Sequence, residues 1–576
     1  MGPLALAILI SGIDDCIVDA VWAVDWFKRR ILKHSRDAAP PKPAAEKRIA
    51  IFVPLWHEHG VIGRMLEHNI AAIDYSNYDF FVGAYPNDEP TLDAVREIEE
   101  RYRQVHLAVC PHDGPTSKAD CLNWIYQRML LHEENHSVQF DIMITHDAED
   151  LIHPASFNTL NQYCDKFDMV QIPVLALPTP PLELVHGVYC DEFAEFQMKD
   201  MLVRRLMGSF TPSSGVGTGF TRAAMQKLAE SSGNRVFEPV CLTEDYENGM
   251  RLHALGCPQM FVPLSTNAAR AVATREYFPR KLRAAIRQRT RWVTGIALQT
   301  WERHGWKGPP GQVYWFWRDR KGLIGNPLSL LSNLTLLYGA ATCYWAPLGR
   351  FAHSVDPRIA AATLFLLTYR TAVRMTCSGR LYGPLFALAA PIRCICANYI
   401  NSAASIHAII RFARAKIRHE PLVWLKTEHG YPSRTALMAH KRKLGEILTT
   451  SGYVDEHAVQ EAIAMKPPEL RLGEYLVRKQ LLTEDELLEA LSLQHGLPAG
   501  PIRPEEVSPH AARALPRHVV QSWRVLPYRI AAGNLHVATP DTPNDEMTRE
   551  LRAFSGLELR FQLVTAENFE ELLQLL

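Results

Sequence analysis

Three short segments carry the residue types that catalyse reactions of charged substrates. Two are acidic, His146–Asp150 and Thr243–Asp245, and the third, Gln288–Trp292, combines amide, basic and aromatic side chains. Carboxylates packed together repel one another unless a divalent cation lies among them, and oxygen ligands suit Mg²⁺ or Mn²⁺. Such an ion also neutralises a diphosphate leaving group. Taken alone, each segment has a plainer explanation, either an acidic helix N-terminus or a helix at the boundary between surface and core.

Short apolar runs predict the strands that would position the first acidic segment. A helical pattern over 61–73 follows the first of four runs, which cover 48–54, 78–83, 104–109 and 140–145. Alternating strands and helices predict a doubly wound α/β sheet, in which ligands bind at the carboxyl ends of the strands. The fourth run ends directly before His146, so the acidic cluster is expected at the ligand-binding edge.

The composition narrows the classes of protein. The 576 residues suffice for several domains of about 150 residues each. Lys plus Arg and Asp plus Glu both number 62, and the zero net charge predicts no nucleic-acid polymer as a partner. The 11 cysteines contain no Cys-x-x-Cys pair, which predicts reduced thiols. Gly215–Thr221 lacks the spacing of a dinucleotide fingerprint, and no Walker loop occurs.

Apolar segments predict membrane helices. Residues 1–30 are expected to form a short anchor, with a surface helix as the alternative. Residues 323–348 contain no charge and are long enough to cross a bilayer, and 358–373 form a further apolar stretch. Basic residues follow the first and the last apolar segment, which predicts that both flanks are cytoplasmic. Three spans satisfy this prediction if the polar-containing stretch 381–410 lies along the membrane surface.

The C-terminal region, 435–576, contains an internal repeat. Lys443-Leu-Gly-Glu-Ile-Leu448 recurs as Arg471-Leu-Gly-Glu-Tyr-Leu476, at the start of two similar units, 443–466 and 471–494. Each unit is expected to form a helix, a turn and a second helix, with Asp455 and Thr483 as N-caps.

The remaining C-terminal residues have the pattern of a small mixed domain. Strands are expected near 525–528 and 535–538, and a terminal helix over 566–576. Together with the repeat, these elements predict a compact C-terminal α+β domain.

In their order and spacing, the motifs of the first part of the chain resemble processive family-2 glycosyltransferases, the group that contains cellulose, chitin and hyaluronan synthases. The resemblance covers approximately residues 48–420. It implies an A-type glycosyltransferase domain at 48–305, followed by transmembrane and interfacial helices at 306–420. Three segments are most similar to inner-membrane glycosyltransferases of the bacteriophage adsorption protein B type: Tyr85–Asp88, His146–Asp150 and Trp317–Gly322.

The resemblance also implies roles for individual residues. Asp245 of the Thr-Glu-Asp motif would be the catalytic base. Asp147 would bind the metal together with Glu149 or Asp150; the family pattern has Asp where Glu149 stands, and the sequence leaves open which of the two is the ligand. The donor would be bound by Pro54, Glu58, Asn87, Asp88, Lys118, Asp120 and Asp147. The acceptor or the diphosphate would contact Glu244, Gln288, Arg291 and Trp292.

These roles imply an inverting, metal-dependent transfer. Asp245 would remove the proton of the acceptor hydroxyl, and as an exposed residue it is expected to have an ordinary pKa near ~4. Arg291 would pair with the diphosphate, and Trp292 would offer a flat apolar face to the acceptor sugar. By family resemblance the donor is a UDP-sugar, with an N-acetylhexosamine as one candidate, and the acceptor is a growing polysaccharide.

The repeated units resemble the N-terminal domain of type II secretion and pilus ATPases, which in some members binds cyclic di-GMP through tandem motifs. A degenerate protein-docking domain is the alternative. Basic side chains can reach phosphates or stack on guanine, and glycines permit close approach. The implied ligand contacts are Lys443, Leu444, Gly445, Leu448, Gly452, Arg471, Leu472, Gly473, Leu476, Leu491 and Gln494.

The sequence therefore predicts a glycosyltransferase of the bacterial inner membrane, with cytoplasmic catalytic and C-terminal domains, activated by cyclic di-GMP. Its expected partners are the donor, the glycan acceptor, membrane lipid and an outer-membrane export protein. The competing hypothesis is a secretion, assembly or phage-receptor factor whose C-terminal domain docks a protein.

Overall fold

The computed structural model describes most of the chain: residues 2–31, 45–264, 271–345, 356–420, 422, 443–450, 453–467, 470–495, 497–531 and 534–574. The chain divides into two compact units, which are described separately. The first holds nearly all described residues up to 422, and the second holds the described residues from Lys443 on.

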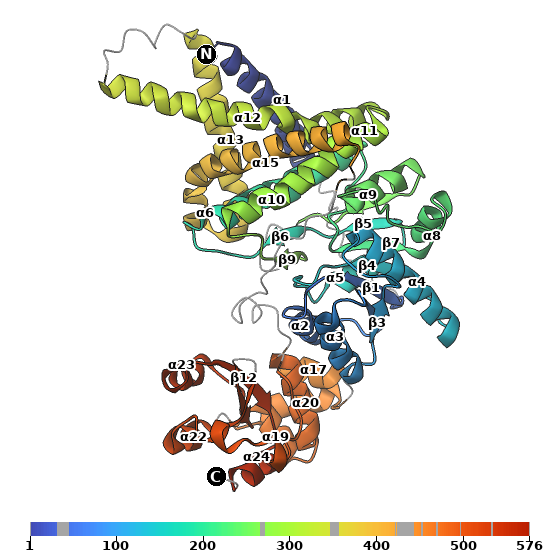
Figure 1. Ribbon diagram of the computed structural model, residues 1–576, viewed down its shortest axis with the longest axis vertical. Coiled ribbons are helices and arrows are strands. Elements are labelled where there is room, and N and C mark those ends of the chain that lie inside the picture. The colour runs from blue at the N-terminus through green and yellow to red at the C-terminus, as the bar shows by residue number, and fades with distance from the viewer. Residues whose placement is uncertain are drawn as a thin grey trace. The chain divides into compact units, whose positions relative to one another are not determined.

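A seven-stranded sheet forms the centre of the first unit (Figure 1). Its order is β3-β2-β1-β4-β7-β5-β8, and β7 runs antiparallel to both of its neighbours. The four predicted strands are confirmed as β1 to β4, and a single register places Ile49 of β1 opposite Tyr78 of β2 and Ile142 of β4. The strands are β1 (Ile49–Pro54), β2 (Tyr78–Ala84), β3 (Val105–Val109), β4 (Ile142–Thr145), β5 (Met169–Gln171), β7 (Thr218–Thr221) and β8 (Gln259–Phe261).

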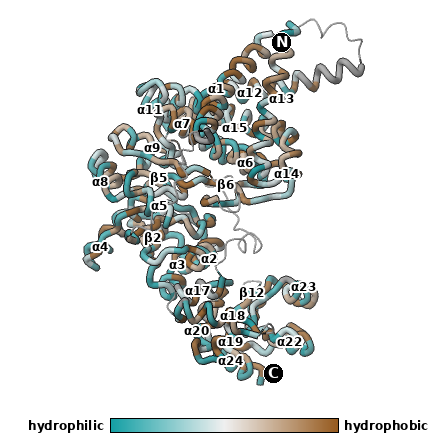
Figure 2. The backbone as a smooth tube through the Cα atoms, turned by 180° about the vertical axis from the view of Figure 1, so that it is seen from behind, coloured by the Kyte–Doolittle hydropathy of each residue, from teal (hydrophilic) through white to brown (hydrophobic). Residues whose placement is uncertain are grey.

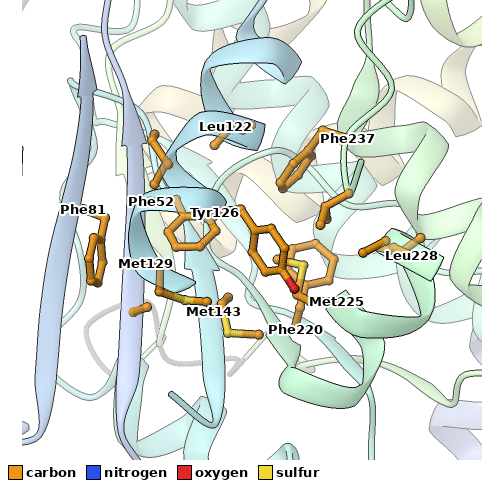
Figure 3. Close-up of a cluster of buried hydrophobic side chains, with 14 of the residues drawn as sticks. Phe52, Phe81, Leu122, Tyr126, Met129, Met143, Phe220, Met225, Leu228 and Phe237 are labelled. Carbon is orange, nitrogen blue, oxygen red and sulfur yellow. The ribbon is translucent and has the colours of Figure 1, made fainter. Parts of the chain in front are cut away.

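Helices cover this sheet because its strands are apolar on both faces. Every residue of β2 and β4 is buried, as expected for strands inside an α/β fold. In Figure 3, Phe52, Phe81, Met143 and Phe220 of four strands pack with Leu122 of α4. The helices are α2 (Ile62–Ala72), α3 (Glu89–Arg101), α4 (Lys118–His136), α5 (Ser156–Tyr163), α8 (Arg222–Ser231) and α9 (Glu244–Ala254).

A small second sheet brings two distant segments together. Its strands, β6 (Val174–Ala176) and β9 (Thr274–Glu276), are parallel. Leu151 forms an antiparallel bridge with Arg275, so the chain just after the acidic motif lies beside β9. After β9 the chain forms α10 (Leu282–Val293), a π-helical segment and α11 (Thr300–His304).

Helices of very different lengths make up the rest of the first unit. They are α1 (Gly2–Ile31), α6 (Leu184–Glu195), α7 (Met201–Leu206), α12 (Pro310–Trp345), α13 (Pro357–Tyr382), α14 (Pro384–Leu388) and α15 (Ala390–Arg418). None of the helices in the described part of the chain is both long and apolar enough to cross a membrane. The predicted spans are therefore not confirmed, and residues 346–348 of one of them lie outside the described residues.

The acidic residues of α1 point into the protein. Asp14 pairs with Arg318 (2.8 Å) and Lys321 (2.6 Å) of α12, and Asp19 pairs with Lys199 at 2.5 Å. Burying these charges is tolerated because each meets an opposite charge. The aspartates that interrupt the apolar N-terminal segment thus attach it to the protein.

Much of helix α15 buries polar side chains and exposes apolar ones, whereas Arg414, Lys416 and Arg418 near its C-terminal end are exposed. Arg393 is fully buried and its Nε donates to Asp191 at 2.6 Å, and Ser402 donates to the Asn326 carbonyl at 2.5 Å. The large hydrophobic side chains that this helix exposes are Ile392, Ile395, Tyr399, Ile406, Ile409, Ile410 and Ile417. Figure 2 likewise shows hydrophobic stretches along α1 and α13. Helices on the surface of soluble proteins instead expose a polar face and bury an apolar one.

The repeat in the second unit folds as predicted. Its four helices, α17 (Leu444–Thr450), α18 (Glu456–Met465), α19 (Leu472–Arg478) and α20 (Glu484–His495), form two equivalent pairs. Asp455 caps α18 by accepting from the His457 amide, and Thr483 and Glu486 form a reciprocal capping box at α20.

The remaining residues form the predicted α+β domain. Strands β10 (Leu526–Ala531) and β11 (Asn534–Thr539) are antiparallel, and β12 (Glu558–Leu563), which was not predicted, pairs parallel to β11. The helices are α21 (Pro509–Ala512), α22 (Arg517–Trp523), α23 (Asp545–Phe554) and α24 (Ala566–Leu573).

Candidate active site

Segments far apart in the sequence meet in one cavity of about 120 Å³ at the carboxyl ends of β1 and β4. This is where an α/β sheet is expected to bind its ligands. Ten of the predicted site residues line the cavity: Pro54, Glu58, Lys118, Asp147, Glu149, Glu244, Asp245, Gln288, Arg291 and Trp292. The three segments chosen for their chemistry therefore form a single site, although their roles stay predictions.

The cavity is strongly acidic. Its lining includes six carboxylates, one of which is Glu276. Only two cations, Lys118 and Arg291, line it. Lys118 lies 2.5 Å from Asp147. A diphosphate would add negative charge to a surface that already repels it, so a divalent cation held by oxygen ligands fits this donor set.

Burial shifts the pKa values of the groups around the predicted base. Burial raises the pKa of Glu244 to about 7, with a further contribution from the Asp245 carboxylate. Burial also raises the pKa of Asp245, against the opposing effect of Lys118. Burial alone would lower the pKa of Lys118, but Asp147 and Glu244 outweigh it, and the pKa is raised. The expectation of an exposed Asp245 with an ordinary pKa is wrong, because α9 begins inside the cavity.

Asp245 is oriented by the first turn of α9. Its Oδ1 accepts a hydrogen bond from the Tyr246 amide at 2.8 Å. Its Oδ2 lies against Gly215, where a Cβ would stand only 2.8 Å from that oxygen and 3.4 Å from the Lys118 Nζ. Gly215 has a φ of +77°. Glycine is therefore required both by this left-handed backbone conformation and by the close approach of the Asp245 carboxylate.

The two candidate second ligands of a metal have different surroundings. Asp150 is fully buried, and its Oδ2 contacts the His146 Nδ1 at 2.7 Å and accepts from the Asp147 amide at 3.0 Å. Asp150 therefore holds the loop that presents Asp147. Glu149 lines the cavity whereas Asp150 does not, which favours Glu149 as the ligand.

Three predicted donor-binding residues do not line the cavity. Asp88 is fully buried and accepts from the His57 amide at 2.6 Å. Asn87 exchanges hydrogen bonds with the backbone of Gly114, at 2.7 and 2.8 Å. Asp120 accepts from Thr116 at 2.7 Å. All three hold the loops beside the cavity.

The cavity-lining residues that sequence reasoning missed include Trp56, Tyr85 and Glu276. Trp56 and Tyr85 follow the ends of β1 and β2 and pack edge to face, with 5.4 Å between ring centroids. Their positions directly after apolar strands are a signal that could have found them. Glu276 has no local signal, because only the bridge between Leu151 and Arg275 brings it to the acidic motif. Burial and the nearby Asp150 raise the pKa of Glu276 well above its ordinary value.

Within the described part of the chain, one group of side chains has ligand atoms close enough to share an ion as they stand: Asp79, His106 and His132. It lies near the amino ends of β2 and β3, away from the cavity. Asp79 already accepts from Arg48 at 3.0 Å and contacts the His106 Nε2 at 2.9 Å. Both carboxylate oxygens are thus occupied, and we assign no metal there.

The repeat residues predicted to contact cyclic di-GMP have different exposures. Lys443 and Arg471 are exposed, Leu444, Leu472, Leu491 and Gln494 are half-buried, and Gly452 lies outside the described residues. Leu448 and Leu476 are fully buried in the domain core, and their predicted contact with a base stays a prediction.

The two repeat glycines have a packing role. A Cβ at Gly445 would lie 2.9 Å from Val459, and one at Gly473 would lie 2.4 Å from Leu487. They therefore permit close packing between the helices of each pair.

Comparison with known proteins identifies the class. Residues 46–295 match the family described as glycosyltransferase like family 2, and residues 495–576 match the MshEN domain. The first match covers the whole cavity, so the chain is a glycosyltransferase with an A-type fold and a C-terminal domain of the MshEN type. The MshEN match begins just after the repeat.

Similarity over most of the chain identifies the family. Bacteriophage adsorption protein B of Escherichia coli (strain K12) is 32% identical over 594 residues, which cover 97% of this chain and 79% of that protein. This chain belongs to the adsorption protein B family. The type IV pilus assembly ATPase PilB of Myxococcus xanthus is 24% identical over 133 residues, 23% of this chain and 24% of that protein.

Among solved structures, a mannosyltransferase of Pyrobaculum calidifontis in complex with GDP-Man and Mn²⁺ shares 18% identity at a TM-score of 0.42, covering 68% of this chain and 97% of that one. The structure of MshE with cdg shares 24% identity at a TM-score of 0.21, covering 23% and 96%.

Proposed function

We propose that this chain transfers a sugar from a nucleoside-diphosphate sugar, with UDP as the nucleotide, to a growing polysaccharide with inversion at the anomeric carbon. The observation that carries the proposal is the meeting of Asp147, Asp245 and Arg291 in one acidic cavity. The match of this region to family-2 glycosyltransferases supports it.

The proposed chemistry uses the chain's own residues as follows. Asp245 accepts the proton of the acceptor hydroxyl while that oxygen bonds to the anomeric carbon and the sugar–diphosphate bond breaks. Lys118 and Arg291 provide positive charge toward the leaving diphosphate. Asp147 and Glu149 would hold a Mg²⁺ or Mn²⁺ ion, which supplies Lewis-acid stabilisation of that leaving group.

Turnover of a panel of UDP- and GDP-sugars by the purified full chain, with Mg²⁺ or Mn²⁺, tests the proposal. We expect one UDP-sugar, such as a UDP-N-acetylhexosamine, to be consumed and a polymer to form. Consumption of no donor with either ion, under conditions where the protein is folded, would contradict the proposal.

We further propose that the chain works at the inner membrane with its catalytic and C-terminal parts in the cytoplasm. The exposed apolar residues of α1, α13 and α15, with Arg393 and Ser402 of α15 buried instead, support an apolar surrounding for much of these helices. An outer-membrane export protein would then receive the polysaccharide. Cell fractionation with protease protection tests the location.

Regulation by cyclic di-GMP at the repeat is part of the proposal. Exposed Lys443 and Arg471 stand at equivalent positions of two matching helix pairs, as two halves of a symmetric dinucleotide require. Calorimetry on the full chain should detect cyclic di-GMP binding, with a loss of roughly tenfold or more in affinity for Arg471→Ala. Arg478→Ala is the matched control, because Arg478 is an exposed arginine at the other end of α19, the helix that Arg471 precedes. Absence of heat, or unchanged affinity in Arg471→Ala, would contradict the assignment.

The name of the Escherichia coli relatives favours one second candidate, a role in phage adsorption. Adsorption assays on cells that produce wild-type chain or Asp245→Asn would separate the two. Phage adsorption that persists without transferase activity would favour a receptor role independent of the polysaccharide.

A further inference from the structure

A second cavity lies on another side of the helix that carries Gln288 and Arg291. This groove of about 580 Å³ runs between α10 and α15, which pack side by side (Figure 1). It is separate from the acidic cavity, and the two share no lining residue. Its position gives it direct contact with the catalytic helix.

The groove is lined by arginine. Five guanidinium groups face it, from Arg283 and Arg287 of α10 and from Arg411, Arg414 and Arg418 of α15, against the one carboxylate of Glu420. Arg283, Arg287, Arg414 and Arg418 form no ion pair with any residue in the described ranges. So many like charges on facing helices repel one another unless an anion lies between them.

The spacing of these residues places them along one face of each helix. Arg283, Arg287 and Thr290 recur at intervals of four and three along α10, and Arg411, Arg414 and Arg418 do so along α15. Gln288 and Arg291 belong to the neighbouring stripe of α10, which faces the acidic cavity. An anion bound in the groove would therefore contact α10 on the side opposite the acidic cavity.

Apolar side chains next to the arginines indicate what kind of anion fits. Ile286 and Ile410 line the groove itself. On the adjacent stripe of α15, Ile406, Ile409 and Ile417 are exposed, Ile417 by 78%. A free phosphate or a nucleotide has no acyl chain to cover these isoleucines. A phospholipid can bind the arginines with its phosphate and the isoleucines with its acyl chains.

We propose that the groove binds the phosphate headgroup of an anionic phospholipid, and that the bound lipid positions α10 for catalysis. The binding part stands on the groove alone. The effect on catalysis rests on the proposed glycosyltransferase function. Planar guanidinium groups pair with phosphate oxygens bidentately, which lysine does not do.

Native mass spectrometry of the purified full chain in zwitterionic micelles tests the binding part. We expect phosphatidylglycerol to be retained, phosphatidylcholine to be lost, and inorganic phosphate in excess not to displace the lipid. Arg287→Gln/Arg414→Gln should weaken retention roughly 10–30-fold, because each basic residue near a lipid surface contributes on the order of one tenfold step or less.

Lys416→Gln is the matched control, since Lys416 is a basic residue of α15 that pairs with Glu302 outside the groove. It should retain phosphatidylglycerol like wild type. Equal retention of phosphatidylcholine, displacement by inorganic phosphate, or wild-type binding by the double variant would each overturn the proposal.

Donor turnover in vesicles of phosphatidylcholine, with and without an equimolar share of phosphatidylglycerol, tests the positioning part. We expect phosphatidylglycerol to raise turnover in wild type and Lys416→Gln but not in Arg287→Gln/Arg414→Gln, with KM for the donor unchanged. If the lipid binds but turnover does not change, the positioning part is wrong. If no variant turns over any donor, the glycosyltransferase proposal fails while the binding result still stands.

Discussion

The two sides of α10 face surroundings of opposite charge. On one side Gln288 and Arg291 line a cavity with six carboxylates and two cations; on the other, Arg283 and Arg287 line a groove with five arginines and one carboxylate. Both sides suit phosphates, but by different means. Where a bond must break, carboxylates favour a metal ion as the positive charge. Where an anion need only be held, fixed guanidinium groups suffice.

Removing the proposed base should have the largest effect on the acidic side. We expect Asp245→Asn to lower turnover about 10²–10⁴-fold, the usual contribution of general base catalysis. UDP binding, measured by calorimetry, should persist because the amide keeps the shape of the carboxylate. Lipid retention in the groove should not change. Wild-type turnover in Asp245→Asn would show that another group is the base.

A pair of variants separates the metal ligand from the residue that supports its loop. Glu149→Gln should weaken Mn²⁺ binding about 10–100-fold, as measured by electron paramagnetic resonance, with no change in thermal stability. Asp150→Asn should instead cost about 1–3 kcal/mol of unfolding free energy, because Asp150 is a buried acceptor of the Asp147 amide. The reverse pattern would make Asp150 the ligand.

Gly215→Ala tests the close packing beside the base. The new Cβ would stand 2.8 Å from the Asp245 Oδ2, so we expect turnover to fall about tenfold as the carboxylate is displaced. Gly208→Ala is the matched control, because Gly208 has a φ of +75° but nothing within 4 Å of a Cβ. Both variants should lose about 1–2 kcal/mol of stability from the backbone, and Gly215→Ala alone should lose activity. Equal activities would contradict the assignment.

The smallest expected effect is a shift in the pH profile. Burial raises the pKa of Asp245, and a base must be deprotonated to act. Turnover should therefore fall on acidification at a higher pH than an ordinary aspartate, with a pKa near ~4, would give. Lys118 opposes this rise, so Lys118→Gln should move the acid limb of kcat/KM to still higher pH. An acid limb that stays in place would show that Asp245 does not control it.

The sequence was most informative where local patterns determine structure. The strands β1 to β4 and the paired repeat helices followed from apolar runs and N-cap residues, and the motif order brought Asp147, Asp245 and Arg291 to one site. Local patterns could not reveal Glu276, because its place depends on the bridge between Leu151 and Arg275. The ordinary pKa expected for Asp245 was wrong for the same reason, since its burial depends on tertiary packing.

The apolar helices show another limit of sequence reading. Hydropathy marks apolar residues, but it does not say which side of a helix faces the protein. In α15 the buried residues include Arg393 and Ser402, while every isoleucine except Ile400 is exposed. Arg393 has a low cost of burial because Asp191, 202 positions earlier, and the carbonyls of Pro181 and Phe386 accept its hydrogen bonds.

The ion pairs of α1 have a consequence for the order of events during synthesis. Arg318 and Lys321, the partners of Asp14, lie 304 and 307 positions further along the chain. At the usual pace of translation the first helix would wait roughly 15–60 seconds before the ribosome has made them. During that interval an apolar helix with unpaired aspartates needs a temporary host, such as a chaperone or a lipid surface. The attachment of α1 through Asp14 is therefore tied to the emergence of α12, long after the catalytic strands have been synthesised.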